Sequence, residues 1–158
     1  MYITYEEYTA LYDPIEEKVF NRISYDACKC LDRHTTGADG VIKLREHFPV
    51  ESDSVEAVRR CAAEVVYIME QIYEAEQSAS LGRAYVSTEN GVRGNVISAI
   101  SSGGESITYT GELKTGIDIA VADPVAQNKL ISQTIRKHLS GVTDANGVGL
   151  LYMGTYPL

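Results

Sequence analysis

The sequence predicts a mainly α-helical protein: a small helical bundle around one long central helix, with a β-hairpin or extended arms and an extended C-terminal segment. A stretch over about residues 53–79 contains no Gly or Pro and repeats apolar side chains every three or four positions. Shorter stretches with helix-capping signals lie on both sides of it. Residues 80–116 are rich in Gly, Ser and Thr, and segments of period two at about 95–110 predict the hairpin or arms.

The central stretch has the pattern of an amphipathic core helix. The opposite face carries Glu56, Arg60 and Glu64, whose four-residue spacing allows ion pairs along the helix. Asp53, with Glu56 three positions later, predicts a capping box at the start. The apolar face consists of Val55, Val58, Ala62, Val65, Met69 and Ile72. This helix is therefore expected to organise the core, and it indicates no function by itself.

A short helix of about two turns is predicted near the N-terminus. Thr4 and Glu7 have capping-box spacing, and Ile3 and Tyr8 have the spacing of a hydrophobic staple.

A second helical stretch is predicted from Pro14 to about Thr35, with Asp13 as its N-cap. The segment 21–24 is interpreted as a break, because Ser24 can cap a new helix. A further short helix, with Val41, Leu44 and Phe48, is expected before Pro49.

After the Gly-rich region, the state of residues 117–122 is left open. Asp123 and Pro124 form a helix start, and Gly141 is well placed as the stop. One side of this helix is expected to carry Val125, Ile131, Ile135 and Leu139. Asn146–Gly147 then indicates a turn, and the segment from Leu150 to Met153 is predicted as a strand or extended arm.

Length and charge narrow the class of protein. A chain of 158 residues fits one domain over 1–158, with 80–116 as a flexible insertion that carries the β arms. The 14 basic and 22 acidic residues give a net charge of −8 without a basic run, which disfavours a nucleic-acid reader. No apolar run is long enough for a membrane span, and the three cysteines do not form a disulfide framework, so a reduced, cytosolic protein is expected.

The residues provide no catalytic, cofactor or metal signature. Cys28 and Cys30 point to different faces of a helix, and the pair of Cys30 and His34 has no second pair to complete a zinc site. The Gly-rich segments lack the residues of a phosphate-binding loop. We therefore predict that the chain is not an enzyme. A small hydrolytic enzyme assembled from distant residues such as Glu105, His34 and Asp118 stays as an alternative.

Several short segments resemble the head–tail connector (adaptor) proteins of long-tailed bacteriophages, encoded by a phage or a prophage. They are the N-terminal ITYEEYTALY, the helix with Ala27 and Leu31 before Thr35–Thr36, and the central helix. A further one is the Ser-rich segment from Ile97 to Tyr109, which ends in a Ser-x-x-Tyr pattern. The last is Leu150-Leu151-Tyr152-Met153-Gly154 near the C-terminus.

The resemblance implies a structural virion protein without enzymatic activity or cofactor, made in the bacterial host cytoplasm. Copies of it are expected to form a homo-oligomeric ring, a dodecamer, under the portal protein at the head–tail junction. The ring extends the DNA channel, through which DNA passes without sequence-specific binding, and meets a tail-completion or stopper protein. The alternative is a non-viral helical protein-interaction or regulatory module. Contacts between subunits or to these partners are expected at Ile97, Ile100, Ser106, Ile107, Tyr109, Leu151, Tyr152 and Met153.

Overall fold

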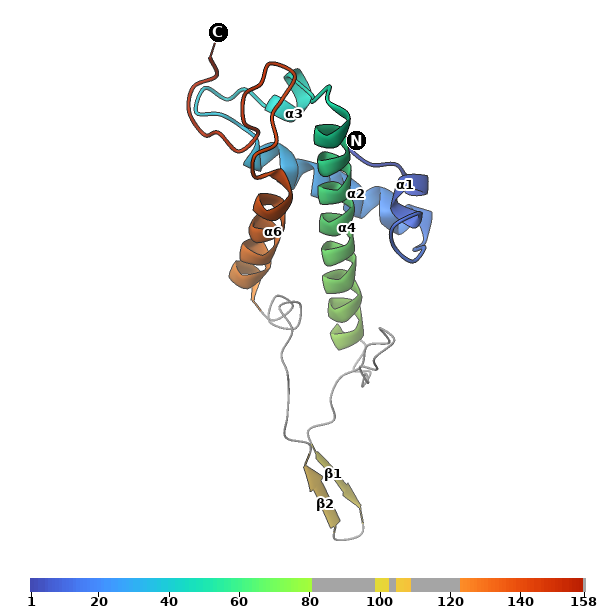
Figure 1. The fold of residues 1–158 in the computed structure, drawn as a ribbon. Coiled ribbons are helices and arrows are strands. Elements are labelled where there is room, and N and C mark those ends of the chain that lie inside the picture. The colour runs from blue at the N-terminus through green and yellow to red at the C-terminus, as the bar shows by residue number, and fades with distance from the viewer. Residues whose placement is uncertain (81–98, 103–104, 109–122, 158) are drawn as a thin grey trace. The chain divides into compact units, whose positions relative to one another are not determined.

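The computed structural model describes residues 1–80, 99–102, 105–108 and 123–157. These residues form five helices and two short strands (Figure 1). In chain order they are α1 (Tyr5–Thr9), α2 (Glu17–His34), α3 (Lys43–Glu46), α4 (Ser52–Ser80), β1 (Ala99–Ser102), β2 (Glu105–Thr108) and α6 (Pro124–Leu139). The prediction of a mainly α-helical protein is confirmed. Among the described helices, none has both the length and the apolar composition that crossing a membrane requires.

The chain divides into two compact units. One comprises Met1–Glu70 and Asn128–Leu158, and the other comprises Gln71–Gln127. The first unit contains α1, α2 and α3 with most of α4 and α6; the second contains the two strands. A single domain over 1–158 with an insertion at 80–116 stays a prediction, because most of that insertion lies outside the described residues.

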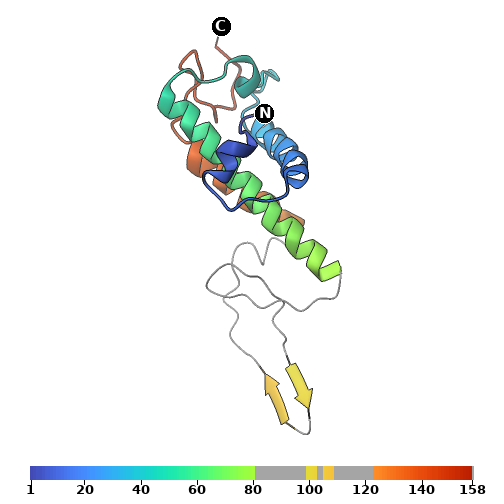
Figure 2. The same cartoon turned by 90° about the vertical axis from the view of Figure 1, so that its right-hand side faces the viewer.

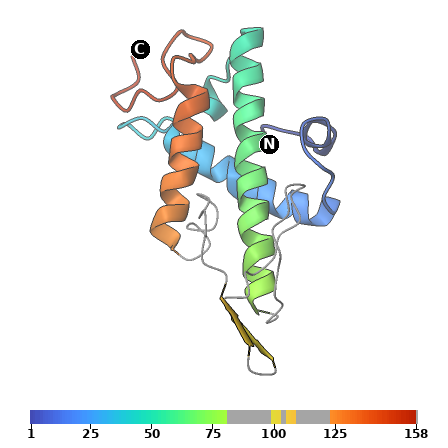
Figure 3. The same ribbon diagram turned by 60° about the horizontal axis from the view of Figure 1, so that its bottom comes forward.

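Helix α4 is the centre of the first unit, as predicted. Helix α6 runs beside it, and α2 crosses behind it (Figures 1 and 3). The helix is buried on more than the predicted face, because Ala63 and Val66 are fully buried as well as Val58, Ala62 and Val65. It begins at Ser52 and not at Asp53, with the Glu51 carbonyl accepting from the Val55 amide at 2.9 Å. Asp53 therefore lies in the first turn, and its prediction as the N-cap is wrong.

Helix α1 has the predicted capping box. The Thr4 hydroxyl accepts from the Glu7 amide at 3.2 Å, and the Glu7 carboxylate accepts from the Thr4 amide at 2.8 Å. Ile3 and Tyr8 are both buried, and the Tyr8 ring lies 5.4 Å from the ring of Phe20 on α2. This short helix is thus held by aromatic packing as well as by its cap. Figure 2 shows α1 packed against the side of the helical unit.

Helix α2 differs from the prediction at its start and its middle. It begins at Glu17, so the predicted N-cap at Asp13 is wrong. The preceding segment is held in another conformation, because the Tyr5 hydroxyl donates to the Ile15 carbonyl at 2.7 Å. The predicted break at 21–24 is also wrong: Ser24 is buried inside a continuous helix, and its hydroxyl donates to the Asn21 carbonyl at 3.3 Å.

The remaining helix signals are mostly confirmed. Helix α3 occupies the short segment predicted before Pro49. On α6 the Asp123 carboxylate accepts from the Val125 amide at 2.9 Å, and Gly141 follows the helix with a φ of 81°. Ile131, Ile135 and Leu139 are buried as predicted. Val125 is 74% exposed, so its predicted place on the buried side is wrong.

Strands β1 and β2 form an antiparallel pair within the segment where a hairpin or arms were predicted. Ile100 lies opposite Ile107, and Ser101 lies opposite Ser106. Ile97, Tyr109 and Asp118 lie outside the described residues, so predictions for them stay untested.

The C-terminal segment is irregular: of the strand or extended arm predicted from Leu150 to Met153, no strand forms. Leu150 and Leu151 form a turn after an isolated bridge between Thr143 and Gly149. The turn predicted at Asn146–Gly147 is confirmed, with Gly147 at a φ of 79°. Leu150 is fully buried. Its carbonyl accepts from the Lys43 ammonium at 3.3 Å, and the Tyr152 amide donates to the Gly149 carbonyl at 3.0 Å, which closes the turn.

Candidate functional site

A buried lysine ties the C-terminal segment to the helices. Lys43 on α3 is fully buried, and its ammonium donates to three backbone carbonyls. These belong to Thr35 at 3.1 Å, Leu150 at 3.3 Å and Tyr152 at 2.6 Å. Burial lowers the pKa of Lys43, while the nearby carboxylates of Asp144 and Asp39 act in the opposite direction. With all three protons donated, this cation holds the chain together and is not available to a ligand.

Two aspartates complete the attachment of the same segment. The buried Asp144 accepts from the Tyr156 hydroxyl at 2.6 Å and from the Asn146 and Val148 amides at 2.9 Å each. Asp39 accepts from the Tyr156 amide at 2.7 Å. The Tyr156 ring also stacks on His47, with 4.4 Å between ring centroids. The chain end is therefore anchored at several points to the segments around α3.

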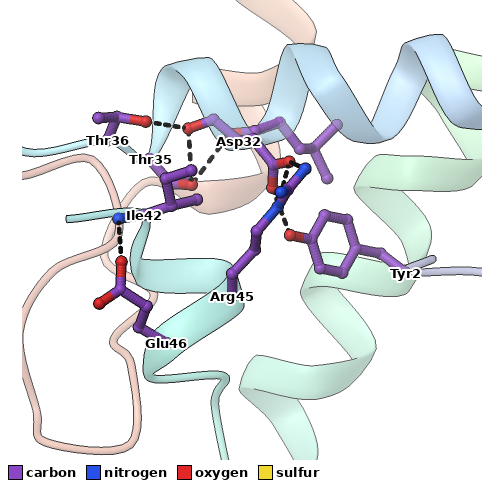
Figure 4. Close-up of polar contacts among 8 residues, drawn as sticks. Tyr2, Asp32, Thr35, Thr36, Ile42, Arg45 and Glu46 are labelled. Carbon is purple, nitrogen blue, oxygen red and sulfur yellow. Dashed lines mark hydrogen bonds and ion pairs between the residues drawn. The ribbon is translucent and has the colours of Figure 1, made fainter. Parts of the chain in front are cut away.

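A second buried carboxylate joins α2, α3 and the N-terminus (Figure 4). Asp32 receives the Tyr2 hydroxyl on one oxygen and the Arg45 guanidinium on the other, with Nε at 2.8 Å. Its backbone carbonyl accepts from the Thr36 hydroxyl at 2.7 Å. Burial, and then the hydrogen bond to Asp32 and its charge, raise the pKa of Tyr2. The hydrogen bonds in Figure 4 satisfy the buried Asp32 carboxylate from a half-buried Tyr2 and an exposed Arg45, an arrangement typical of a structural role.

The closest approach to a catalytic pair is His34 with Ser132. His34 Nδ1 lies 2.8 Å from the Cys30 carbonyl and must donate to it, so in the neutral ring Nε2 accepts from the Ser132 hydroxyl at 2.9 Å. Both residues lie inside helices, whose amides are used by the helix and cannot serve as oxyanion donors. The pair therefore holds α2 against α6. Both ring nitrogens of His34 are engaged in these contacts, and the Cys30 thiol accepts from the Arg33 guanidinium at 3.6 Å.

Glu64 on α4 makes the corresponding link to the end of α6. It accepts from His138 at 2.5 Å and from Lys137 at 3.1 Å. Partial burial would raise the pKa of Glu64, but these hydrogen bonds and the charges of the two partners lower it. Lys137 and His138 lie in the last turn of this helix, and no spacing rule in the sequence indicates the carboxylate that they share.

The described residues thus use their polar groups to hold the fold together. No buried side-chain nitrogen or oxygen in the described part of the chain lacks a hydrogen-bond partner. Nor do three or more potential metal-binding side chains converge anywhere among the described residues. The exposed side chains of the described residues are therefore considered as a candidate interaction surface.

The predicted contact residues near the C-terminus lie at the surface. Tyr152 and Met153 are 52% and 61% exposed, and Leu151 is half-buried. Met153 lines an open hollow together with Lys29 and Arg33 of α2 and Arg45 of α3. Of the strand residues predicted as contacts, Ile100, Ser106 and Ile107 lie in the β1–β2 pair.

The hollow opens onto a basic face that was not predicted. We define the basic face as the exposed side chains of Lys18, Arg22, Lys29, Arg33 and Arg45. The four on α2 are separated by four, seven and four positions, a spacing that places them on one side of a helix. Because no two of them are adjacent in the sequence, a search for basic runs does not find them. Helical periodicity applied to charged residues finds them.

Comparison of the chain with protein-family models, with curated proteins and with solved structures finds no match.

Proposed function

We propose that this chain is a structural subunit of a phage head–tail junction. In this role, copies of the chain form a ring under the portal protein, extend the DNA channel and present a surface to the next tail-completion protein. The function is mechanical: the helical unit is the rigid body, and its surface segments make the contacts to neighbours.

One observation carries the proposal most directly. A helical unit built on α4 keeps its buried polar groups in structural bonds, while the paired strands β1 and β2 lie between α4 and α6 in sequence. This order of elements agrees with the connector-like layout: a capped short helix, a long central helix, a Ser-rich strand region and a C-terminal segment. Such a protein needs rigid packing and accessible surface, and it needs no substrate pocket.

The anchored C-terminal segment supports the same role. Lys43 and Asp144 fix its backbone, yet Tyr152 and Met153 remain exposed. Aromatic and Met side chains held rigidly at a surface are favourable contact residues, because little conformational entropy is lost when a partner covers them.

The test is electron microscopy of the purified protein with the portal protein encoded in the same phage or prophage. We expect an added ring of density at the end of the portal that faces the tail, and the chain to be detected in purified virions by mass spectrometry. A protein absent from virions and unable to bind the portal contradicts the proposal. If it is then recovered with a single non-viral partner in a one-to-one complex, it is an interaction module instead.

A further inference from the structure

The basic face lies on a protein that is otherwise acidic. The chain has 14 basic and 22 acidic residues, and five of the basic ones form this face. Asp32 pairs with Arg45 there, and Asp26 is a further exposed carboxylate on α2. Lys29 and Arg33 have no carboxylate within ion-pair distance among the described residues; Lys29 lies 4.4 Å from the centre of the Tyr25 ring. Their charge is therefore available to a partner.

The face also has an apolar centre. Tyr25 is 60% exposed and Met153 is 61% exposed, and Ile42 lines the hollow beside Arg45. Phosphate backbones need cations alone, whereas a protein partner also needs apolar contact inside a charged rim. The basic face combines cations with apolar side chains, on a chain with a net charge of −8. This combination favours an acidic protein surface over DNA as its partner.

A surface with the complementary features exists on the same chain. We define the acidic corner as the exposed carboxylates of Glu6, Asp13, Glu16 and Glu17, around the connection from α1 to α2. Leu11, 45% exposed, supplies an apolar centre there. The connection is held in place by the bond from Tyr5 to Ile15 and by Tyr12, whose ring stacks on Tyr67 with 4.7 Å between centroids. The corner is thus ordered before any partner arrives, which lowers the entropic cost of docking.

The part of the basic face around the hollow is remote from the acidic corner of the same molecule, although Lys18 and Arg22 lie close to that corner on α2. Glu17 and Arg33 lie near opposite ends of one continuous helix, about 24 Å apart along its axis. A contact between the acidic corner and the Lys29–Arg33 end of the basic face must then join different copies, and it is heterologous: each copy uses its corner on one neighbour and its basic face on the other. Such a contact, repeated, closes a ring or extends a filament.

We propose that the basic face of α2 and α3 binds the acidic corner of a second copy of this chain. This inference deepens the proposed function, because it assigns the surfaces that join neighbouring subunits, and in that sense rests on it. The contact is driven by charge, so its strength falls as ionic strength rises and screening shortens the range of the attraction.

The test is sedimentation velocity of the full chain at low and high ionic strength. We expect salt-sensitive self-association that is lost in Lys29→Glu/Arg33→Glu and, separately, in Glu16→Lys/Glu17→Lys. Mixing the two variants restores association, because each supplies a reversed surface that matches the other. A milder Lys29→Gln/Arg33→Gln variant weakens association without introducing a new charge, and circular dichroism verifies that every variant folds.

Lys129→Glu/Arg136→Glu is the matched control. It makes the same change of charge at exposed positions of α6, and we expect it to associate as the wild type does. The proposal is overturned if the wild type stays monomeric at millimolar concentration and low salt, or if mixing the two reversed variants restores nothing. It is also overturned if the wild type retards duplex DNA in a gel and Lys29→Glu/Arg33→Glu abolishes this DNA binding but leaves self-association unchanged.

These outcomes separate the inference from the proposed function. Rings that form on the portal but are insensitive to both charge reversals contradict the inference alone. If the mixed charge-reversed variants associate but the protein does not bind the portal, only the proposed function is contradicted.

Discussion

The ammonium of Lys43 lies 2.6 Å from the carbonyl oxygen of Tyr152, a residue 109 positions away in the chain. The same group binds carbonyls at the end of α2 and in the C-terminal turn. A buried cation with three acceptors replaces the regular hydrogen bonds that this irregular segment cannot make with itself. The Lys43 side chain is therefore one of the groups that fix the surface position of Tyr152 and Met153, together with Asp144 and Asp39.

Replacing Lys43 by Met tests this contribution. The change keeps much of the side-chain volume but leaves three buried carbonyls without their donor, so we expect a loss of about 2–3 kcal/mol in the free energy of unfolding. Amide hydrogen exchange of residues 150–157 is expected to speed up more than that of α4. Urea unfolding and exchange measured by mass spectrometry provide the two readouts.

Lys129→Met is the control, because it removes an exposed lysine from α6. Its unfolding free energy is expected within about 0.5 kcal/mol of the wild type. If Lys43→Met behaves like this control, the lysine does not hold the segment.

Local signals in the sequence predicted the helices well where no contact from another element competed with them. The capping box at Thr4 and the start at Asp123 depend on atoms within three residues, and both are present. The start at Asp13 failed because Tyr5, ten residues from Ile15, binds the carbonyl there. A local rule cannot anticipate a competing hydrogen bond from another element.

The surfaces and clusters were harder to predict than the helices. The contacts of Lys43 with Leu150 and of Tyr2 with Asp32 join residues far apart in sequence, and no spacing rule connects them. A lysine in a short helix usually faces solvent, so nothing in the sequence indicated that Lys43 is buried. The basic face was predictable in principle, because its α2 residues follow helical periodicity.

The raised pKa of Tyr2 predicts sensitivity to alkali. Folding holds the Tyr2 proton above the usual tyrosine pKa of 10.0, where the unfolded chain has lost it. The folded state then binds more protons, so the free energy of unfolding falls as pH rises above that value. In Tyr2→Phe this part of the fall is expected to disappear, while stability at neutral pH drops by about 1–2 kcal/mol because Asp32 loses a donor. Urea unfolding on both sides of pH 10 measures the change of the unfolding free energy with pH, and Tyr25→Phe, which alters an exposed tyrosine, is the control. If the unfolding free energy of Tyr2→Phe falls with pH as steeply as that of the wild type, the prediction is wrong.

The lowered pKa of Glu64 predicts the opposite dependence, in acid. A carboxylate with a depressed pKa stabilises the fold above its usual value of 4.5 and loses that contribution as pH falls through the folded pKa. We expect Glu64→Gln to reduce stability at neutral pH and to show a smaller further loss on acidification than the wild type. Glu56→Gln, which removes an exposed carboxylate paired with Arg60, is expected to change the acid profile little. Equal acid profiles for Glu64→Gln and the wild type exclude a role for this carboxylate.

Burial of Cys61 predicts a thiol that reports opening of the helical unit. Burial, and then the charge of Glu64, raise the pKa of Cys61 to about 12, so almost no thiolate exists at neutral pH. In Cys28→Ala/Cys30→Ala, where Cys61 is the single cysteine, we expect its reaction with a thiol-specific reagent to be far slower than that of free cysteine. Its rate is expected to rise with urea as the unit opens, because only the unfolded chain presents an ordinary thiol.

Labelling in the native state as fast as that of a free cysteine, independent of urea, means that α4 is not packed around Cys61 as described. A second double variant, Cys61→Ala/Cys28→Ala, keeps the half-buried Cys30 and is expected to react faster in the native state.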